Sequence, residues 1–305
     1  MIIGSILRYR KIYKNYISVG FAVIRKKPKI LCRLRDQGEN FLSYLNADAL
    51  VRLVLDYSQD LKETANLLAK DSFRFHGHTV YLKGDPDNGA KIDVFFREEY
   101  RQLDVKGKSV VDIGANVGDT PIYFALNGAE RVIALEPYPF SYKLARENIE
   151  ANGLSNTIIL MNSAYGIGGY IQLKDEQSTD RTRDLHLDKK ASSNAVIVDR
   201  KSLRDLINTY RLESIVLKVD CEGCEYNLLE EDDHVFEKIE AVQIEYHYGY
   251  ESLVDKLMRL GFEVTHTEGK KWHNKNATDP EMQIGFIYAK RNRLDGMPLS
   301  MNKHE

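Results

Sequence analysis

The sequence predicts a doubly wound, Rossmann-like α/β fold, in which helices cover both faces of a mostly parallel sheet. Short apolar runs that end in an acid recur along the chain, as at residues 108–113 and 214–220, and such runs are typical of buried parallel strands. Helical segments separate these runs, which is the alternation expected of βαβ units. The last strand, residues 283–290, is expected to pair with residues 262–266 as a hairpin and therefore to run antiparallel.

The first βα unit carries a glycine-rich loop between two acidic residues. Asp112 lies near the end of the strand at residues 108–113, and Glu136 follows the next strand. The loop between the first strand and its helix consists of small and polar residues, which include Gly114, Ala115, Asn116 and Gly118. A strand, a glycine loop, a helix, a second strand and an acid, in this order, form the general design for holding a nucleoside.

The helix after this loop has its own start and stop signals. Either Asp119 or Thr120 is expected to cap its N-terminus. Pro121 suits the first turn, because a missing N–H costs nothing there. Gly128 is expected to end the helix.

The same loop lacks the features of two common nucleotide-binding motifs. A dinucleotide fingerprint needs glycine at the first, third and sixth positions, where this chain has Gly114, Asn116 and Asp119. Asp119 would place a negative charge where the phosphates bind, and the Gly-Lys-Ser/Thr ending of a P-loop is absent. The arrangement suits S-adenosylmethionine (SAM), because Glu136 can accept both ribose hydroxyls and Gly114 leaves room for the ligand. Asp112 can hold the loop or help to satisfy the ammonium group.

Four motifs, in this order, resemble those of FkbM-type methyltransferases, which are class I SAM enzymes that mostly methylate hydroxyl oxygens, often on sugars. The motifs are residues 111–119, Glu136-Pro137, residues 217–225 and Ile244-Glu-Tyr-His247. The resemblance implies a class I methyltransferase sheet and SAM as cofactor. The resemblance covers roughly residues 95–290 and fades before them. We therefore expect a methyltransferase domain over residues 96–291, and the residue patterns on either side predict a mixed α+β extension at residues 1–95 and a polar tail at residues 292–305.

Further cofactor residues are expected at both sides of the first βα unit. In the family, an acid just before the first core strand borders the methionine end of SAM, which makes Glu98 (or Glu99) and Tyr100 candidates. A solvated helix face is the alternative for these residues. Asn162 and Ala164 follow the third core strand and are expected beside the adenine, because ligands bind outside the carboxyl ends of the strands.

Four polar side chains are expected to meet at the mouth of the pocket: Asp220, Glu222, Glu245 and His247. Residues 245 and 247 point to the same face, because the strand period is two. His247 is the expected base for an acceptor hydroxyl, with Glu245 or Asp220 orienting it. A divalent cation held by Asp220 and Glu245 is the alternative, although we expect no metal. Hydrogen bonding within the loops is the simplest role for all four.

The first 35 residues contain ten Lys or Arg residues and no acid before Asp36. Apolar residues are interleaved with these charges at loosely helical spacing: Ile6, Leu7, Tyr9, Tyr13, Tyr16 and Ile17. One interpretation is an amphipathic helix that touches an anionic membrane surface or a phosphorylated carrier. The commoner alternative is a basic helix packed on the core domain, whose apolar side covers a sheet edge.

The segments outside the nucleoside unit give weaker signals. Residues 47–70 have helical periodicity, residues 73–82 alternate like a strand, and residues 90–96 are expected to return as a second strand after a turn. His76 and His78 would share one face of the first strand, which makes a metal site conceivable, but surface histidines are far commoner. A hairpin at residues 165–173 and 195–198 is expected around a long polar loop that serves as a lid or substrate wall.

The chain has three cysteines, of which Cys221 and Cys224 stand at C-x-x-C spacing. This spacing suits a redox or zinc site, but zinc would need a second ligand pair and Cys32 is the remaining cysteine. By the resemblance, both positions usually hold small apolar residues. An odd number of cysteines predicts no disulfide framework and favours a reducing, cytoplasmic compartment.

Composition fits a soluble enzyme. The 305 residues are 43% hydrophobic with a net charge of −2, which does not suggest nucleic acid as a partner. No apolar run approaches the ~20 residues that span a membrane, and the N-terminus does not resemble a signal peptide. We expect a SAM-dependent O-methyltransferase whose acceptor is a small molecule or a glycan with a free hydroxyl. A nucleic-acid methyltransferase and a non-catalytic SAM-binding module are the alternatives.

Overall fold

The protein is built around one large, mostly parallel sheet. The computed structural model describes residues 2–36, 38–56, 60–84, 91–174, 195–271 and 282–291. Its central strands are β5 (Ser109–Ile113), β6 (Arg131–Leu135), β7 (Ile158–Met161), β11 (Ile215–Val219), β12 (Ile239–Tyr246), β13 (Glu263–His266) and β15 (Gln283–Lys290). Their order across the sheet is β13-β15-β12-β11-β5-β6-β7, and β14 (Lys270–Lys271) pairs with β15.

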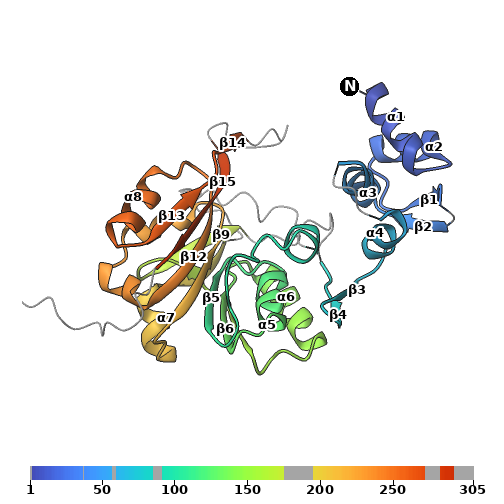
Figure 1. Cartoon of the computed structure of the whole chain (residues 1–305). Helices are drawn as coiled ribbons and strands as arrows, with labels where there is room; N and C mark the ends of the chain where they lie inside the picture. Colours follow the sequence, from blue (N-terminus) through green and yellow to red (C-terminus); the bar gives the residue numbers. More distant parts are fainter. Residues whose placement is uncertain are drawn as a thin grey trace, which may run out of the picture.

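The directions of the strands confirm the predicted fold class. β7, β6, β5, β11 and β12 run parallel to one another, whereas β15 runs antiparallel to both β12 and β13. Helices α5 (Asp119–Leu126) and α6 (Pro139–Ala151) cover one face, and α7 (Leu203–Tyr210) and α8 (Glu251–Arg259) cover the other (Figure 1). This is the doubly wound arrangement of a class I methyltransferase sheet.

Consecutive residues of the central strands contribute to two different cores. Val110 packs in the core on the side of α5, while its neighbour Val111 packs in the core on the side of α7 and α8. Val132 and Ile133 divide in the same way. Both faces are buried, which is why these strands read as continuous apolar runs rather than as alternating ones.

Helix α7 was not predicted from the sequence, although the residues at its start form a recognisable N-cap. Ser202 caps the helix by accepting a hydrogen bond from the backbone N–H of Asp205, whose side chain accepts one from the backbone N–H of Ser202. This reciprocal pair is a capping box with Asp in place of the usual Glu.

The glycine loop differs from the prediction in how its helix begins. Gly118 is the N-cap of α5, with φ +89°, and no side chain caps the helix. The expected cap by Asp119 or Thr120 is therefore wrong: Asp119 is the first helical residue, and the Thr120 hydroxyl donates to Asp112 Oδ2 at 2.5 Å. Gly118 is required here, because an added Cβ would lie 3.1 Å from backbone atoms of Ala145 on α6, in addition to the left-handed φ.

A small sheet follows β7 and confirms the expected hairpin. It consists of β8 (Ala164–Tyr165), β9 (Tyr170–Lys174) and β10 (Ala195–Lys201), with β9 and β10 antiparallel. Two 3₁₀ helices, η3 (Cys224–Leu229) and η4 (Asp233–Lys238), lie between β11 and β12. Three predicted segments lie wholly or almost wholly outside the described residues: the lid loop at residues 174–194, the turn at residues 84–89 and the tail at residues 292–305.

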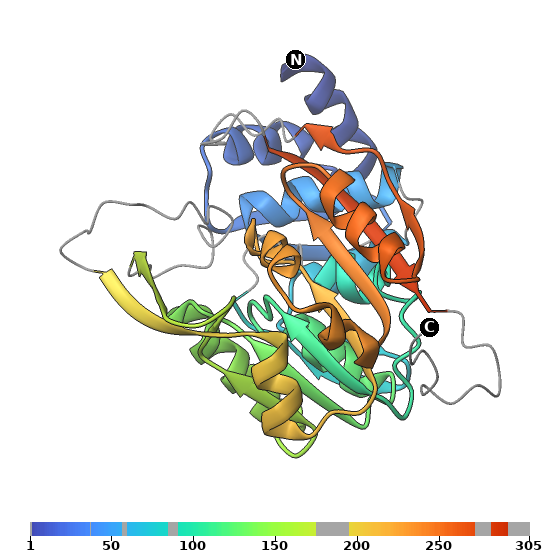
Figure 2. The same cartoon turned by 90° about the vertical axis from the view of Figure 1, so that its left-hand side faces the viewer.

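The N-terminal region forms a separate cluster of elements to one side of the large sheet (Figures 1 and 2). Its elements are α1 (Ile2–Ile12), α2 (Tyr16–Ile24), β1 (Ile30–Leu34), β2 (Gly38–Leu42), α3 (Tyr44–Asp56) and α4 (Leu61–Leu68). Helix α1 packs on α2 and α3, and Tyr13 on the α1–α2 connection donates to the backbone carbonyl of Ala47 at 2.7 Å. The expectation that the basic helix packs on the core domain is therefore wrong. The sheet edge that it meets is that of β1, where Tyr13 pairs with Leu34. Within the described ranges, no helix has the length and apolar character needed to cross a membrane.

The segment before the first core strand also differs from the prediction. Residues 73–82 form a hairpin of β3 (Ser72–Phe75) and β4 (His78–Tyr81), because His76 and Gly77 adopt positive φ angles of 41° and 86° in a tight turn. The predicted return strand is instead a short π-helix, η1 (Lys91–Phe96). His76 lies in the turn and not on a strand, so the expected pair of histidines on one strand face is wrong.

Candidate active site

A cavity of about 360 Å³ opens at the carboxyl ends of β5, β6 and β11. Ile113, Leu135 and Ile171 contribute an apolar wall, which suits a flat, weakly polar group such as a nucleobase. Gly114 and Ala164 also line the cavity, as expected for cofactor residues. The cavity therefore lies where a doubly wound sheet binds its ligand.

Gly114 has a second role that the sequence did not reveal. Its φ is +85°, and an added Cβ would lie 1.8 Å from the carbonyl oxygen of Asp220. Glycine is thus required because the turn after β11 approaches the loop after β5 this closely, and not only because a ligand needs room.

Glu136 is the acid at the end of β6, and it is held rigidly. Only 4% of its surface is exposed. Its Oε2 accepts a hydrogen bond from the backbone N–H of Asn116 at 2.8 Å, and its Oε1 accepts one from that of Tyr138 at 2.9 Å. Burial raises the pKa of Glu136 to about 8, although both hydrogen bonds oppose the shift. Each oxygen keeps a second lone pair, so the residue fits a ribose diol.

The loop residues Ala115 and Asn116 complete the surroundings of Glu136. The backbone N–H groups of Gly114 and Ala115 both donate to the carbonyl of Leu135, which ties the loop to β6. Asn116 has φ +47°, and its buried Oδ1 has no hydrogen-bond partner among the described residues. An unsatisfied buried acceptor beside an acid is a reasonable partner for a ligand that brings donors, which SAM does.

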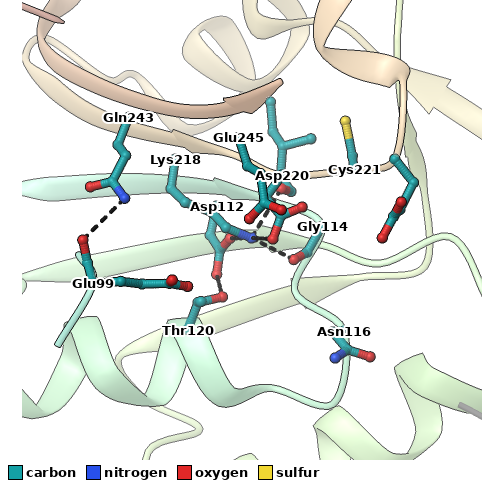
Figure 3. A network of polar contacts seen from close by, with 12 residues as sticks. Glu99, Asp112, Gly114, Asn116, Thr120, Lys218, Asp220, Cys221, Gln243 and Glu245 are labelled. Carbon is teal, nitrogen blue, oxygen red and sulfur yellow. Dashed lines mark hydrogen bonds and ion pairs between the residues drawn. The ribbon is translucent and has the colours of Figure 1, made fainter. Parts of the chain in front are cut away.

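Asp112 and Lys218 form a buried ion pair beneath the loop (Figure 3). Lys218 Nζ lies 3.1 Å from Asp112 Oδ1, donates to the carbonyl of Gly114 at 2.6 Å and lies 3.9 Å from Asp220 Oδ2. Burial alone would lower the pKa of Lys218, but Asp112 and Asp220 together raise it above its ordinary value. Asp112 therefore holds the loop through Lys218 and Thr120. Lys218 was missed, although a lysine within an otherwise apolar strand was a visible signal.

Asn162 supports the cofactor site from behind. Its side-chain amide donates to the backbone carbonyls of both Glu136 and Pro137, each at 2.9 Å. These bonds fix the backbone that carries the ribose acid. Asn162 is not among the residues that line the cavity, so its expected contact with the adenine stays a prediction.

The segment before β5 places Glu99, and not Glu98, beside the polar cluster. Glu98 turns toward the β3–β4 hairpin, where its carboxylate lies 3.5 Å from His76 Nε2 and from the Tyr123 hydroxyl. Glu99 points toward the Asp112–Lys218 pair (Figure 3), and burial, followed by Asp93 and Asp220, raises its pKa to about 7. Tyr100 is buried, with its ring centroid 5.9 Å from Lys218 Nζ. Of the two acids weighed for the cofactor's methionine end, Glu99 is the better placed.

The expected catalytic side chains do come together. His247 Nε2 lies 3.3 Å from Glu222 Oε2 and 4.0 Å from Glu245 Oε1, and one ligand atom each of Asp220, Glu245 and His247 lies within 4.8 Å of the other two. Glu222 also lines the cavity, so the cluster borders the cofactor site directly. The sequence predicted this convergence from the neighbouring strands β11 and β12.

Glu225 orients His247, a role that the sequence analysis gave to Glu245 or Asp220. Its Oε1 lies 3.0 Å from His247 Nδ1 and also accepts from the backbone N–H of His247 at 2.9 Å. Glu225 is itself fully buried, and its Oε2 accepts from the backbone N–H of Gly223 at 2.8 Å. The pairing points His247 Nε2 toward Glu222 and Glu245; this buried nitrogen makes no hydrogen bond of good geometry within the described parts of the chain.

The charges of the cluster are strongly coupled. Burial would lower the pKa of His247, but the hydrogen bond and charge of Glu225, followed by Glu222 and Asp220, raise it to about 10. Burial and the charge of Asp220 raise the pKa of Glu245 well above its ordinary value. His247 is thus an imidazolium at neutral pH as the cluster stands, and the surplus of carboxylates favours a cationic ligand.

The same cluster has the residue types to hold a divalent cation. Asp220, Glu245 and His247 would supply two oxygens and one nitrogen, with Glu225 behind the histidine. However, the Lys218 ammonium already lies 3.9 Å from Asp220. SAM would also bring positive charge to this region, so a metal is not needed to balance the carboxylates.

Cys221 and Cys224 form a disulfide in the wall of the cavity. The odd number of cysteines therefore does not exclude a disulfide, contrary to our expectation. Both residues flank a turn in which Glu222 and Gly223 have φ angles of 55° and 111°, and this turn brings the two Cα atoms to 5.4 Å. The third cysteine, Cys32, is free and buried in the N-terminal region.

Comparisons with known proteins agree with this geometry. The methyltransferase FkbM domain family matches residues 112–264, which is about half of the chain and includes both the glycine loop and the cluster of acids around His247. A ribosomal protein L11 methyltransferase from Carboxydothermus hydrogenoformans is 44% identical over 57 residues, 19% of each chain. One from Tolumonas auensis is 40% identical over 58 residues, 19% of this chain and 20% of the relative. The chain thus spans about a fifth of the length of these curated relatives.

Solved structures of other methyltransferases are similar at low identity. A precorrin-6y C5,15-methyltransferase from Geobacter metallireducens is 14% identical, with a TM-score of 0.35 over 64% of this chain and 87% of that chain. A ribosomal protein L11 methylase from Lactobacillus delbrueckii is 16% identical, with a TM-score of 0.34 over 64% and 77%.

The family match and the site lead to the same conclusion. The matched residues contain the loop after β5, the buried acid Glu136 and the cluster around His247. The buried acceptors at Glu136 and Asn116 and the surplus of carboxylates fit the ribose and the positive charge of SAM. This chain belongs to the FkbM methyltransferase family, and SAM is its methyl donor.

Proposed function

We propose that the protein transfers a methyl group from SAM to a hydroxyl oxygen of a small molecule or a glycan. The observation that carries this proposal is the buried Glu225–His247 pair beside the cavity, whose Nδ1···Oε1 distance is 3.0 Å. A hydroxyl is a poor nucleophile at neutral pH and needs a base at hydrogen-bond distance, which contributes roughly 10²–10⁴-fold to the rate. A histidine oriented by a carboxylate is such a base.

The residues divide the work between binding and proton transfer. Glu136 accepts the ribose hydroxyls, while the loop after β5, braced by Asp112 and Lys218, shapes the site around the donor. SAM supplies a methyl group on a positively charged sulfonium. The carboxylates of Asp220, Glu222 and Glu245 stabilise this charge and leave the acceptor hydroxyl facing His247.

The protonation of His247 changes when the donor binds. In the free protein the surrounding acids hold the pKa of His247 at about 10, so its base form is scarce at neutral pH. A cation beside Glu222 and Asp220 offsets their negative charge, so the imidazolium of His247 is less stabilised and its pKa falls. His247 therefore becomes a competent base only in the complex with SAM, and we propose that no metal takes part.

A nucleic-acid or protein acceptor is the main alternative. The named relatives include methyltransferases of ribosomal protein L11, yet their similarity covers 19–20% of their length. The net charge of −2 lacks the basic footprint that a nucleic-acid enzyme usually carries. A non-catalytic module would bind SAM without turnover.

A turnover assay separates these possibilities. The purified protein is incubated with SAM and panels of sugars, nucleotide sugars, phenols, RNA and ribosomal protein, and formation of S-adenosylhomocysteine is measured. We expect turnover with a hydroxyl acceptor, and a reduction of roughly 10²–10⁴-fold in His247→Ala with SAM affinity retained.

The exposed His234 provides a matched control, since it lies on η4 with 84% of its side chain exposed. His234→Ala should turn over like the wild type. Methylation of RNA or of a protein nitrogen would overturn the proposed acceptor class. SAM binding without turnover on any acceptor would favour the non-catalytic module.

A further inference from the structure

Helix α2 presents its large apolar side chains to solvent. Ile17, Phe21 and Ile24 are 54%, 53% and 54% exposed. They are spaced four and three residues apart, so they lie on one face of the helix. The buried positions are taken by smaller residues, namely Val19, Gly20 and Ala22. This is the reverse of a helix on the surface of a soluble domain, whose large apolar residues face the core.

Other elements of the N-terminal region also expose large apolar side chains. Leu7 on α1 is 57% exposed, and α1 packs directly on α2. Phe41 on β2 is also 57% exposed, and the ammonium of Lys29 lies 4.6 Å from the centre of its ring. Single exposed apolar residues are common, but several on packed neighbours indicate an interaction site.

The chain segments that flank α2 carry charge of one sign. Exposed basic side chains precede and follow the helix: Arg10, Lys11, Lys14, Arg25, Lys26, Lys27 and Lys29. No Asp or Glu occurs before Asp36. A partner that fits this surface therefore has both negative charge and an apolar region that can bury Ile and Phe side chains.

We propose that α1 and α2 form a docking surface for an anionic lipid bilayer, with Ile17, Phe21 and Ile24 inserted below the headgroups. A helix of nine residues is roughly 14 Å long, far shorter than the ~30 Å hydrocarbon core, so α2 lies in the interface and does not span it. The flanking lysines and arginines meet the anionic headgroups. Nucleic acid would pair with the charges but would leave the apolar face in water.

This surface is independent of the proposed function, because none of its residues lines the cavity. It explains why a chain with a net charge of −2 concentrates ten basic residues in its first 35. It also accounts for the small residues on the inner side of α2, which let the helix pack while its large side chains stay outside.

Co-sedimentation of the full chain with vesicles tests the proposal. The vesicles are pure phosphatidylcholine or phosphatidylcholine with 30% phosphatidylserine, at low and high salt. We expect binding only to the anionic vesicles, and weaker binding as the salt rises. Ile17→Ser/Phe21→Ser and, separately, Lys26→Glu/Lys27→Glu should each weaken the partition roughly ten-fold or more.

Two controls keep the result interpretable. Met258→Ser removes an equally exposed apolar residue from α8, where 60% of Met258 is exposed, and should bind vesicles like the wild type. Thermal melting checks that each variant is folded, and Phe21→Ser alone replaces any double variant that is not. Absence of wild-type binding to anionic vesicles, or unchanged binding in folded variants, would overturn the proposal. Retention on RNA at physiological salt without vesicle binding would also overturn it.

Discussion

Replacing Glu136 separates its two tasks, which are holding the loop and binding the ribose. Its carboxylate accepts two backbone N–H groups, from Asn116 and Tyr138. Glu136→Gln keeps an acceptor for one of them, so one buried donor loses its partner at a cost of ~1–3 kcal/mol in folding free energy. Glu136→Ala orphans both donors. Above about pH 8, where Glu136 is ionised, the loss of two hydrogen bonds to a charged group costs ~1.5–3 kcal/mol each. The affinity for SAM should then be lower by roughly 10²–10⁴-fold.

Calorimetric titration with SAM, accompanied by thermal melting, measures both effects. Glu147→Gln, an exposed acid on α6, is the matched control and should bind SAM like the wild type. We expect no detectable binding in Glu136→Ala and strongly weakened binding in Glu136→Gln. A folded Glu136→Ala variant that binds SAM with wild-type affinity would refute the assignment of the ribose acid.

The raised pKa of Glu136 adds a pH dependence with a definite sign. The free protein holds this proton up to about pH 8, whereas the unfolded chain loses it near the ordinary value of 4.5. The fold is therefore less stable as the pH rises from 4.5 to 8, as far as this residue contributes. Ribose hydroxyls favour the ionised carboxylate, so SAM affinity should rise through about pH 8 in the wild type and not in Glu136→Gln.

Three further predictions follow from the same geometry. Glu225→Gln removes the carboxylate whose hydrogen bond and charge do most to raise the pKa of His247, so the rising limb of the pH–rate profile should move to lower pH. A lower plateau with an unmoved limb would mean that Glu225 is only structural. Gly114→Ala would place a Cβ 1.8 Å from the carbonyl oxygen of Asp220, at a residue with positive φ. Thermal melting should therefore show that the free energy of unfolding falls by more than ~2 kcal/mol. An unchanged melting temperature would contradict the close approach. Incubation with a chelator should leave turnover unchanged, while loss of turnover that a divalent cation restores would assign a metal to Asp220, Glu245 and His247.

The sheet and the cofactor loop could be predicted because local signals specify them. The strands are buried on both faces and read as apolar runs, and each delivers a polar residue at its carboxyl end, as β6 does with Glu136. Strand order then brings Asp220, Glu245 and His247 together without any knowledge of side-chain packing. The convergence of the expected catalytic residues depends only on β11 and β12 being neighbours.

Other features depend on contacts between residues that no local pattern reveals. Asp112 forms an ion pair with Lys218, which lies more than 100 residues further along the chain. Glu225 contacts His247 because of the turn after β11. Sequence spacing therefore predicts neither of these contacts. The β3–β4 turn at His76 depends on a positive φ, which is uncommon for any residue other than glycine and which the alternating pattern did not indicate. The disulfide was missed because an odd cysteine count suggested unpaired thiols, while the pairing depends on the turn between Cys221 and Cys224.

Titration of the wild-type protein with SAM, and in parallel with NAD⁺, tests the central claim most directly. The loop after β5 and the acid after β6 predict that SAM binds and that NAD⁺ does not, since Asp119 opposes the phosphates of a dinucleotide at the start of α5. Binding of SAM alone would establish the donor site and leave the acceptor as the remaining question. Binding of NAD⁺ in preference to SAM, or of neither, would contradict the interpretation of the Asp112–Glu136 unit.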